Sequence, residues 1–359
     1  MEREKVIRDI LAKRAQTRDQ LRVHPELKHL FFEVTNRCNL SCLHCGSSCS
    51  AREGEDMPID YIFRTLESVK RNCKPNRLML CVTGGEPLLY SDLTRAMSYA
   101  TDQGFYWGMT TNATLIDDKK ARSLFDAGLK SVTVSLDGLE DSHNWFRNTP
   151  GSFALAQRGI KALLDHAPSD ARVDIITVVN KRNLSELEEI YRRISDTGIR
   201  SWRVVNMEPI GRALQNTDLM LDPDEYKRLF AFIVEKHFNS RNIDVNYGCS
   251  HYLTLEYERM VRPYSFTCIA GLQVASIACN GDILACLDIE RRPELVQGNI
   301  REDDFWQVWE NRFSFFRSDR AALSRKCAGC PDREYCAGDS AHTWNYDINE
   351  PMLCMKEVL

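Results

Sequence analysis

Short runs rich in β-branched and aromatic residues alternate with amphipathic stretches from residue 30 to about residue 207. The six runs begin at residues 30, 77, 105, 130, 172 and 200, so the five intervals between them average 34 residues. A βα unit with its connections needs about 30 residues or more. The intervening stretches predict helices over 58–72, 91–104, 117–128, 152–166 and 184–198. The pattern predicts an α/β fold of six βα units with a parallel sheet, either open or part of a barrel.

The rest of the chain departs from this period on both sides. Residues 1–28 predict a charged helical extension, and residues 29–212 the βα domain. Residues 213–262 predict connector helices, with one long helix that ends near residue 237. In 263–359, glycines, cysteines and aromatic residues replace regular periodicity, which predicts a loop-rich module without an evident apolar core. Such a module needs metal or disulfide staples.

Composition limits where the chain acts and what it binds. The net charge of −4 argues against a protein that tracks nucleic-acid phosphates, and we see no apolar stretch long enough for a membrane span. The first 20 residues lack the apolar core of a signal peptide. We therefore expect a cytoplasmic protein with no nucleic-acid or membrane partner. There thiols stay reduced, so 14 cysteines indicate metal binding rather than disulfides.

Unusual motifs follow each predicted strand. CNLSCLHC follows the first run and GGEP (84–87) the second, while TNAT (111–114) and SLDG (135–138) end the third and fourth. Asn180 and Glu208 follow the fifth and sixth. Because functional groups of such folds gather at the carboxyl ends of the strands, we expect these motifs to line one mouth.

The first motif offers three thiolates within eight residues, as Cys38-x3-Cys42-x2-Cys45. This is not the usual spacing of a zinc site, and an iron–sulfur cube normally takes four cysteines. Three would leave one iron open to a ligand that is not protein. The alternative is that Cys49 closes the cluster and makes a simple electron carrier. The glycines of GGEP favour the open cluster, because they let the backbone approach a ligand closely and place the Glu86 carboxylate near an amino group. Alone, GGEP is only a tight turn.

With these motifs the chain resembles the radical S-adenosylmethionine (SAM) superfamily, whose signature is a C-x3-C-x2-C loop followed by GGE. The resemblance covers residues 30 to about 212. It implies a partial (β/α)6 barrel of the TIM-like kind with a [4Fe–4S] cluster on Cys38, Cys42 and Cys45. One electron would cleave SAM, bound to the open iron, into a 5′-deoxyadenosyl radical that abstracts hydrogen from substrate. The SAM contacts implied are Gly84, Gly85 and Glu86 to the methionine amino group, His44 near adenine, Asn112, Ser135, and Arg147 to the carboxylate.

The late cysteines resemble a second family, the SPASM domain of radical SAM enzymes that modify peptides and proteins. The matching pattern is Cys268-x12-Gly281-x4-Cys286, then Cys327-x2-Cys330-x5-Cys336 and Cys354. The resemblance implies one or two auxiliary [4Fe–4S] clusters, the outer one on Cys327, Cys330, Cys336 and Cys354. A four-cysteine zinc ribbon on the same residues is the alternative.

The inner cluster is where the chain departs from that family. Serine stands at position 340 and arginine at 262, where the family has cysteines. Cys268 and Cys286 match, and the upstream candidate is Cys249, with Cys279 as another. We expect a site on three cysteines with an open iron. The alternatives are a ligand from Ser340, Asp339 or His342, or no inner cluster.

The resemblance predicts an enzyme that modifies a ribosomally made peptide or protein, with a thioether favoured over a carbon–carbon link, an epimer or an oxidised residue. Its partners would be that substrate and an electron donor such as flavodoxin or ferredoxin. Since 28 residues before the first strand are too few for a recognition domain, a leader peptide would bind either the groove between barrel and module or a separate leader-recognition protein. One alternative is a sulfatase-type formylglycine maturase. That group has an aspartate directly after the second module cysteine, whereas here Leu287 intervenes before Asp288, our only candidate catalytic residue. The others are small-molecule cofactor biosynthesis and a non-catalytic electron carrier.

Overall fold

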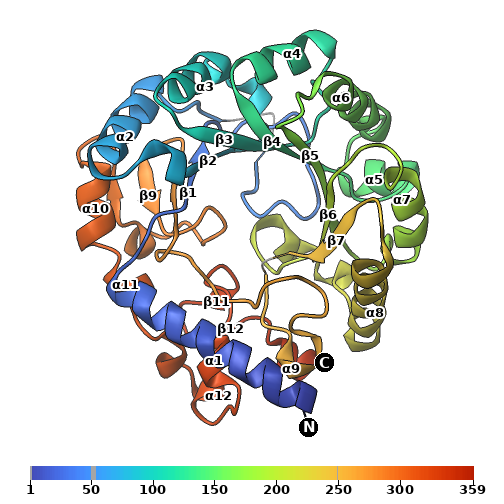
Figure 1. The fold of residues 1–359 in the computed structure, drawn as a ribbon, viewed down its shortest axis with the longest axis vertical. Coiled ribbons are helices and arrows are strands. Elements are labelled where there is room, and N and C mark those ends of the chain that lie inside the picture. The colour runs from blue at the N-terminus through green and yellow to red at the C-terminus, as the bar shows by residue number, and fades with distance from the viewer. Residues whose placement is uncertain (1, 50–53, 249) are drawn as a thin grey trace.

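The computed structural model describes residues 2–49, 54–248 and 250–359 (Figure 1). Seven strands, hydrogen-bonded in chain order and all parallel, form the centre of the molecule. They are His29–Glu33 (β1), Met79–Thr83 (β2), Tyr106–Thr111 (β3), Leu129–Ser135 (β4), Arg172–Val179 (β5), Ser201–Asn206 (β6) and Asp244–Tyr247 (β7). The first six lie on the six predicted runs, so the predicted parallel α/β sheet is confirmed.

Helices cover the outer face of this curved sheet (Figure 1). They are Ile59–Asn72 (α2), Leu93–Asp102 (α3), Asp118–Asp126 (α4), Glu140–Phe146 (α5), Ser152–His166 (α6), Leu187–Ile194 (α7) and Pro223–Asn239 (α8). Alternate strand residues such as Leu80, Val132, Ile175 and Trp202 are buried, as expected for strands with one face packed under helices. The five predicted helices between the strands are confirmed, and so is the long helix near residue 237.

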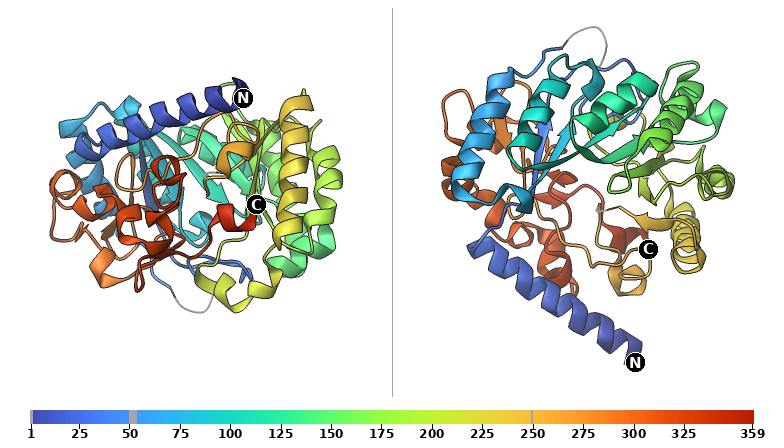
Figure 2. Two further views of the ribbon diagram at one scale, coloured as in Figure 1. Left: turned by 90° about the horizontal axis from the view of Figure 1, so that it is seen from below. Right: turned by 45° about the horizontal axis from the view of Figure 1, so that its top comes forward.

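The C-terminal chain extends the sheet on the other side of β1. Val274–Ile277 (β8) pairs in parallel with β1, and Asp282–Leu284 (β9) and Gly298–Asn299 (β10) continue from it antiparallel. The edges of the sheet, β7 and β10, do not pair with each other, so the barrel is partial, as predicted. Glu2–Val23 (α1), the predicted N-terminal helix, lies across the open side beside the C-terminal segment (Figures 1 and 2).

Two expectations for the second half of the chain are wrong in detail. The region 213–262 contains the strand β7 and not helices alone. The C-terminal module does have an apolar core, because Ile277, Ile283, Trp309 and Phe313 are buried in the same cluster as the barrel residues. Strands of two to four residues are too short to show a period in the sequence, which is why they were missed.

The remaining elements are short. They are Thr254–Tyr257 (α9), Phe305–Asn311 (α10), Ser314–Arg317 (α11), Arg325–Ala328 (α12), Arg333–Cys336 (α13), Met355–Val358 (α14), and the two-stranded pair Trp344–Asn345 (β11) and Glu350–Pro351 (β12). α1 packs against α9, α11 and α13, so the first helix of the chain is fixed to the C-terminal module. None of the described helices is long and apolar enough to cross a membrane.

Candidate functional site

The three cysteines of the first motif lie together on the loop after β1. Cys38 and Cys42 are buried, Cys45 packs against them, and the backbone N–H of Leu40 donates to Cys38 Sγ at 3.5 Å. Burial raises the pKa of the Cys38 thiol to about 12, and it also raises the pKa of Cys42 although Arg147 opposes it. Such thiols become thiolates when metal cations replace their protons. Two buried thiols and a third, partly buried one on the same loop therefore fit an iron–sulfur cluster.

The loop is held in place by the chain after β6. The Arg212 guanidinium donates to the carbonyls of Cys42 at 3.2 Å and Cys49 at 2.6 Å, and its backbone N–H donates to Cys45 O at 2.9 Å. Gly211 has a φ of +54°, and a Cβ there would lie 2.1 Å from Gly46 O. This close backbone approach requires glycine. No sequence motif points to Arg212, because its partners are all backbone atoms.

A fourth thiol, that of Cys49, belongs to the same cluster of buried cysteines. A hydrogen bond between the Cys45 and Cys49 thiols lowers the pKa of Cys45 to about 6 and raises the pKa of Cys49. The sulfur of Cys49 also contacts Ser47 O at 3.8 Å.

The GGEP segment lies directly against the start of the cysteine loop. A Cβ at Gly84 would lie 2.2 Å from Thr35 O, and one at Gly85 would lie 2.1 Å from Arg37 O. The backbone N–H groups of Gly85 and Glu86 donate to these same two carbonyls at 2.8 and 2.9 Å. The segment and the loop thus form one backbone unit in which no larger residue fits.

The carboxylate of Glu86 is buried and faces the end of β3. It accepts hydrogen bonds from Thr111 Oγ1 at 2.7 Å, Asn112 N at 2.8 Å and Leu88 N at 3.2 Å, while burial raises its pKa. Asn112 in turn donates to Asn39 Oδ1 at 2.9 Å. These bonds connect GGEP, TNAT and the cysteine loop.

His44 and Arg147 meet at Asp137, the aspartate of SLDG. Arg147 Nη2 lies 2.5 Å from Asp137 Oδ2, and Arg147 Nη1 donates to Cys42 Sγ at 3.6 Å. His44 stacks on Phe146 with ring centroids 4.2 Å apart, and its burial holds its pKa well below the usual range, so the ring is neutral. His44 Nδ1 and Arg147 Nε are buried without a hydrogen-bond partner among the described residues. Such groups fit a polar cofactor. The motif SLDG indicates this region, although nothing in the sequence distinguishes Asp137 within it. Ser135 lies half-buried at the end of β4.

The four cysteines predicted for the outer cluster line one cavity of about 350 Å³ at α12, α13 and α14. Burial raises the pKa values of Cys327, Cys336 and Cys354. A cavity surrounded by four thiols fits a complete four-cysteine cluster.

The inner site is less complete. Cys268 and Cys286 both interact electrostatically with the Tyr346 hydroxyl, although burial is the main cause of the raised pKa of Tyr346. The backbone N–H of Ala341 donates to Cys268 Sγ at 3.4 Å. Ser340 is buried and its hydroxyl donates to Ser250 O. Cys279 lies elsewhere, 3.9 Å from Glu55 Oε1. Cys249 lies outside the described residues.

A buried network that sequence reasoning missed joins the end of β6 to the C-terminal module. His251 is fully buried, with Nε2 3.0 Å from Glu208 Oε2 and Nδ1 2.6 Å from Asp339 Oδ2. Desolvation opposes protonation, but these two carboxylates outweigh it and raise the pKa of His251 to about 10, so the ring is a cation at neutral pH. Within the network, Glu208 stands out in the sequence by its place after the sixth strand and Asp339 as an alternative ligand of the inner cluster, whereas nothing points to His251.

Carboxyls gather around this network at the mouth. Asp288 is an exposed residue, but the surrounding atoms partly shield its carboxyl group from water, which raises its pKa. The carboxyl group also interacts with His342, Glu208 and Arg291. Arg291 pairs with the buried carboxylate of Glu33 at the end of β1. Glu208, at the end of β6, and Glu33, at the end of β1, are thus linked through Asp288 and Arg291.

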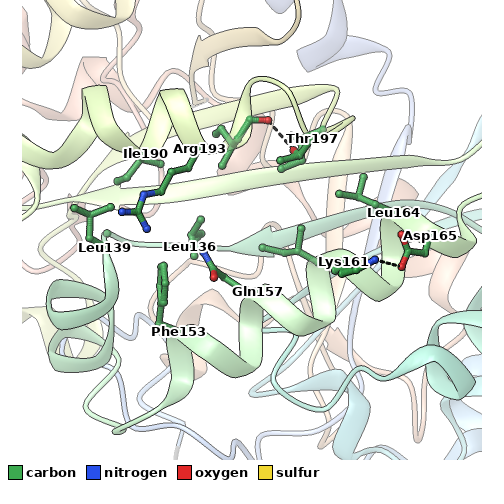
Figure 3. A pocket seen from close by; sticks show the side chains of 14 residues that line it. Leu136, Leu139, Phe153, Gln157, Lys161, Leu164, Asp165, Ile190, Arg193 and Thr197 are labelled. Carbon is green, nitrogen blue, oxygen red and sulfur yellow. Dashed lines mark hydrogen bonds and ion pairs between the residues drawn. The ribbon is translucent and has the colours of Figure 1, made fainter.

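Among the described residues, no three His, Cys, Asp or Glu side chains converge on a point that would hold a single metal ion. In a [4Fe–4S] cluster each thiolate binds a different iron, so the cysteine side chains need not point at one common position. The described structure also has a cavity of about 410 Å³ between α6 and α7, lined by Leu136, Phe153, Ile190 and charged residues such as Lys161 and Arg193 (Figure 3). It contains none of the predicted site residues.

Comparison with known proteins assigns both regions. Residues 32–194 match the model of the radical SAM superfamily, and residues 268–331 match the iron–sulfur cluster-binding domain SPASM. The chain is 29% identical to an AdoMet-dependent heme synthase of Methanosarcina barkeri, over 87% of this chain and 91% of that protein. It is 26% identical to the mycofactocin maturase MftC of Mycolicibacterium smegmatis, over 86% and 76% of the two chains.

Two solved structures share the fold. Streptococcus suis SuiB bound to S-adenosylmethionine has a TM-score of 0.68 at 20% identity, over 88% of this chain and 73% of that one. The structure of anSMEcpe with AdoMet and a peptide has a TM-score of 0.69 at 18% identity, over 93% and 94%. At these identities the likeness concerns the fold alone. SAM and iron–sulfur clusters are the cofactors that the two matched domains use, as predicted. The chain is therefore an enzyme of the radical SAM superfamily that carries a C-terminal SPASM domain.

Proposed function

We propose that this chain cleaves SAM reductively and uses the radical to abstract hydrogen from a ribosomally made peptide or protein. When bound on Cys38, Cys42 and Cys45, the cluster supplies the electron that cleaves SAM. The outer auxiliary cluster is held by Cys327, Cys330, Cys336 and Cys354. The inner one is held by Cys268, Cys286 and Cys249.

The chain's own residues prepare the SAM site. Gly84 and Gly85 let the GGEP backbone lie against the cysteine loop, which leaves backbone carbonyls and Glu86 to receive the methionine amino group. Asp137 fixes the Arg147 guanidinium 3.6 Å from Cys42 Sγ, so this cation lies beside the cluster where the SAM carboxylate is expected. His44, neutral and stacked on Phe146, offers a flat apolar face to adenine. Asn112 and Ser135 complete the contacts.

The charge of the mouth supports a peptide substrate. Glu33, Glu208, Asp288 and Asp339 belong to one interacting group with the basic side chains Arg291, His251 and His342. Arg291 pairs with Glu33 and His251 with Glu208 and Asp339, so neither of these two cations is free for substrate carboxylates. A neutral peptide backbone suits such a mouth better than a porphyrin with several propionates. Asp288, which is exposed there, is our candidate to accept a proton from the substrate.

A haem-type substrate is the second candidate, because the chain is 29% identical to a heme synthase over most of both chains. Thioether formation is the favoured peptide modification, because an inner cluster without a fourth cysteine leaves an iron for a substrate thiol. We place the reaction in the cytoplasm, with flavodoxin or ferredoxin as electron donor and a separate protein that recognises the leader.

The test is an anaerobic incubation of reconstituted enzyme with SAM and dithionite. One arm contains short peptides encoded beside its gene, and another contains an iron porphyrin with propionate side chains. Mass spectrometry is expected to find 5′-deoxyadenosine and, in the peptide arm, a product lighter by two hydrogens. Decarboxylation of the porphyrin with unchanged peptides would overturn the peptide proposal, and absence of 5′-deoxyadenosine in every arm would overturn SAM cleavage.

A further inference from the structure

We propose that Cys49 is an exchangeable fourth ligand of the first cluster. Its thiolate binds the iron that Cys38, Cys42 and Cys45 leave open, and SAM displaces it. This inference rests on the proposed function, because it requires a cluster on those three cysteines.

Cys49 lies among the three ligands and not beside them. It is 7% exposed, and it shares a buried cluster with Cys38 and Cys42, against which Cys45 packs. Its thiol is hydrogen-bonded to that of Cys45 and interacts electrostatically with Cys38. It thus faces two of the three ligands at once. A cube that binds these ligands brings its irons within reach of the fourth sulfur.

The backbone of Cys49 is held as firmly as those of the ligands. One guanidinium, that of Arg212, donates to the carbonyl of Cys42 and to that of Cys49, at 3.2 and 2.6 Å. By contrast, the contacts of the Cys49 sulfur with described residues are weak ones, with the Cys45 thiol and with Ser47 O at 3.8 Å. The residue is therefore anchored by its backbone while its side chain can change partner.

Without a metal, the neighbouring groups disfavour a thiolate at this position, because the Cys45 sulfur, burial, the Cys38 sulfur and the Glu33 carboxylate all raise the pKa of Cys49. Arg291, at the mouth, interacts with both Cys49 and Glu33, so the positive charge that a Cys49 thiolate needs must come from an iron. A thiolate is the ligand that iron–sulfur clusters prefer, so a buried thiol next to an open iron loses its proton to solvent and binds. SAM offers the iron two ligand groups, an amino and a carboxylate group, whereas Cys49 offers one sulfur, so SAM can displace Cys49. On its displacement Cys49 takes back a proton and returns to its hydrogen bond with Cys45. No electron moves in this exchange.

The test uses Cys49→Ala and Cys49→Ser, with Cys73→Ala as matched control, because Cys73 is a half-buried thiol at the end of α2 far in sequence from the site. A cube with an iron that lacks a protein ligand loses that iron on mild oxidation and becomes a [3Fe–4S] cluster, which has its own EPR signal. Each full-length protein is reconstituted, oxidised with limiting ferricyanide, and measured with and without SAM. The signal of a variant with Cys38, Cys42 and Cys45 all replaced by alanine is subtracted as the contribution of the late clusters.

Without SAM, we expect both Cys49 variants to give a [3Fe–4S] signal about threefold or more above wild type and above Cys73→Ala. With SAM the difference should vanish, because SAM then covers the open iron in every protein. SAM should also bind the Cys49 variants about threefold or more tightly, since it no longer has to displace a ligand.

Equal signals in wild type and both variants without SAM would overturn the inference. So would a difference that persists at saturating SAM. In either case, formation of 5′-deoxyadenosine by the wild type would leave the proposed function standing. If the wild type forms none, the proposed function fails instead.

Discussion

The two cysteine regions of this molecule are built in different ways. The first loop has three buried cysteines, Cys38, Cys42 and Cys49, and Arg212 ties it to the chain after β6. Backbone of this region passes so close to Gly84, Gly85 and Gly211 that a Cβ on any of them would lie within 2.2 Å of a carbonyl oxygen. Of the late cysteines, Cys327 and Cys336 lie on helices of four residues and Cys330 and Cys354 next to such helices, and all four are half-buried around a cavity. Its rim carries exposed ion pairs such as Lys326–Glu357, which contribute little stability. The barrel therefore shapes the first site, whereas the late site depends more on its metal.

The largest effect is expected from replacing Cys38, Cys42 and Cys45 together by alanine. Dithionite-driven formation of 5′-deoxyadenosine should be abolished, because no other described thiols lie at the SAM site except Cys49. The late cluster should stay, since its ligands lie on separate elements. Chromatography for 5′-deoxyadenosine and iron analysis measure both. Surviving SAM cleavage would show that the radical assignment is wrong.

Replacing Cys327 and Cys330 by alanine should give the complementary result. The outer cluster is lost, SAM cleavage without substrate remains, and the modified product falls at least tenfold because the auxiliary cluster is no longer complete. This variant should also unfold at a lower temperature, if the metal is what fixes the late module. Unchanged product and unfolding temperature would contradict a role for these cysteines.

The barrel with its first cysteine loop could be predicted from the sequence to a larger extent than the C-terminal module. The six strand runs and the motifs at their ends were visible because long, periodic elements and fixed spacings leave a local pattern. The roles of Asp137 and Arg212 and the pairing of Glu208 and Asp339 with His251 were not visible, because the partners lie 10 to 170 residues apart in the chain or are backbone atoms. The core of the C-terminal module was missed because its short strands have no pattern of their own: β8 pairs with β1, β9 with β8 and β10 with β9.

A smaller effect is expected from Ser340→Cys, which tests whether the inner site is open. Ser340 is buried and precedes Ala341, whose N–H donates to Cys268 Sγ at 3.4 Å, so a cysteine at 340 lies near a predicted ligand. A thiolate there should fill the open iron and lower peptide cross-linking several-fold, while SAM cleavage without substrate stays near normal. Modification at the wild-type rate would contradict recruitment of a substrate thiol by that iron.

The smallest expected effect is on stability, and it is measured by replacing one glycine in each of the two cysteine regions. Gly85→Ala places a Cβ 2.1 Å from Arg37 O and should cost about 1–3 kcal/mol of stability. Gly329→Ala, between Cys327 and Cys330, meets nothing within 4 Å and should change stability by less than about 0.5 kcal/mol. Anaerobic thermal unfolding of the two reconstituted variants measures the difference. Equal loss in both would mean that the backbone approach at GGEP does not shape the first site.

The central claim is that two separate cysteine sets hold two or more iron–sulfur clusters, and metal analysis of the reconstituted wild type tests it most directly. Iron, sulfide and zinc are determined per chain after anaerobic reconstitution, and Mössbauer spectra identify the clusters. The account predicts at least two [4Fe–4S] clusters, hence about eight irons or more per chain and no zinc. About four irons or fewer, with zinc bound by the late cysteines, would contradict it.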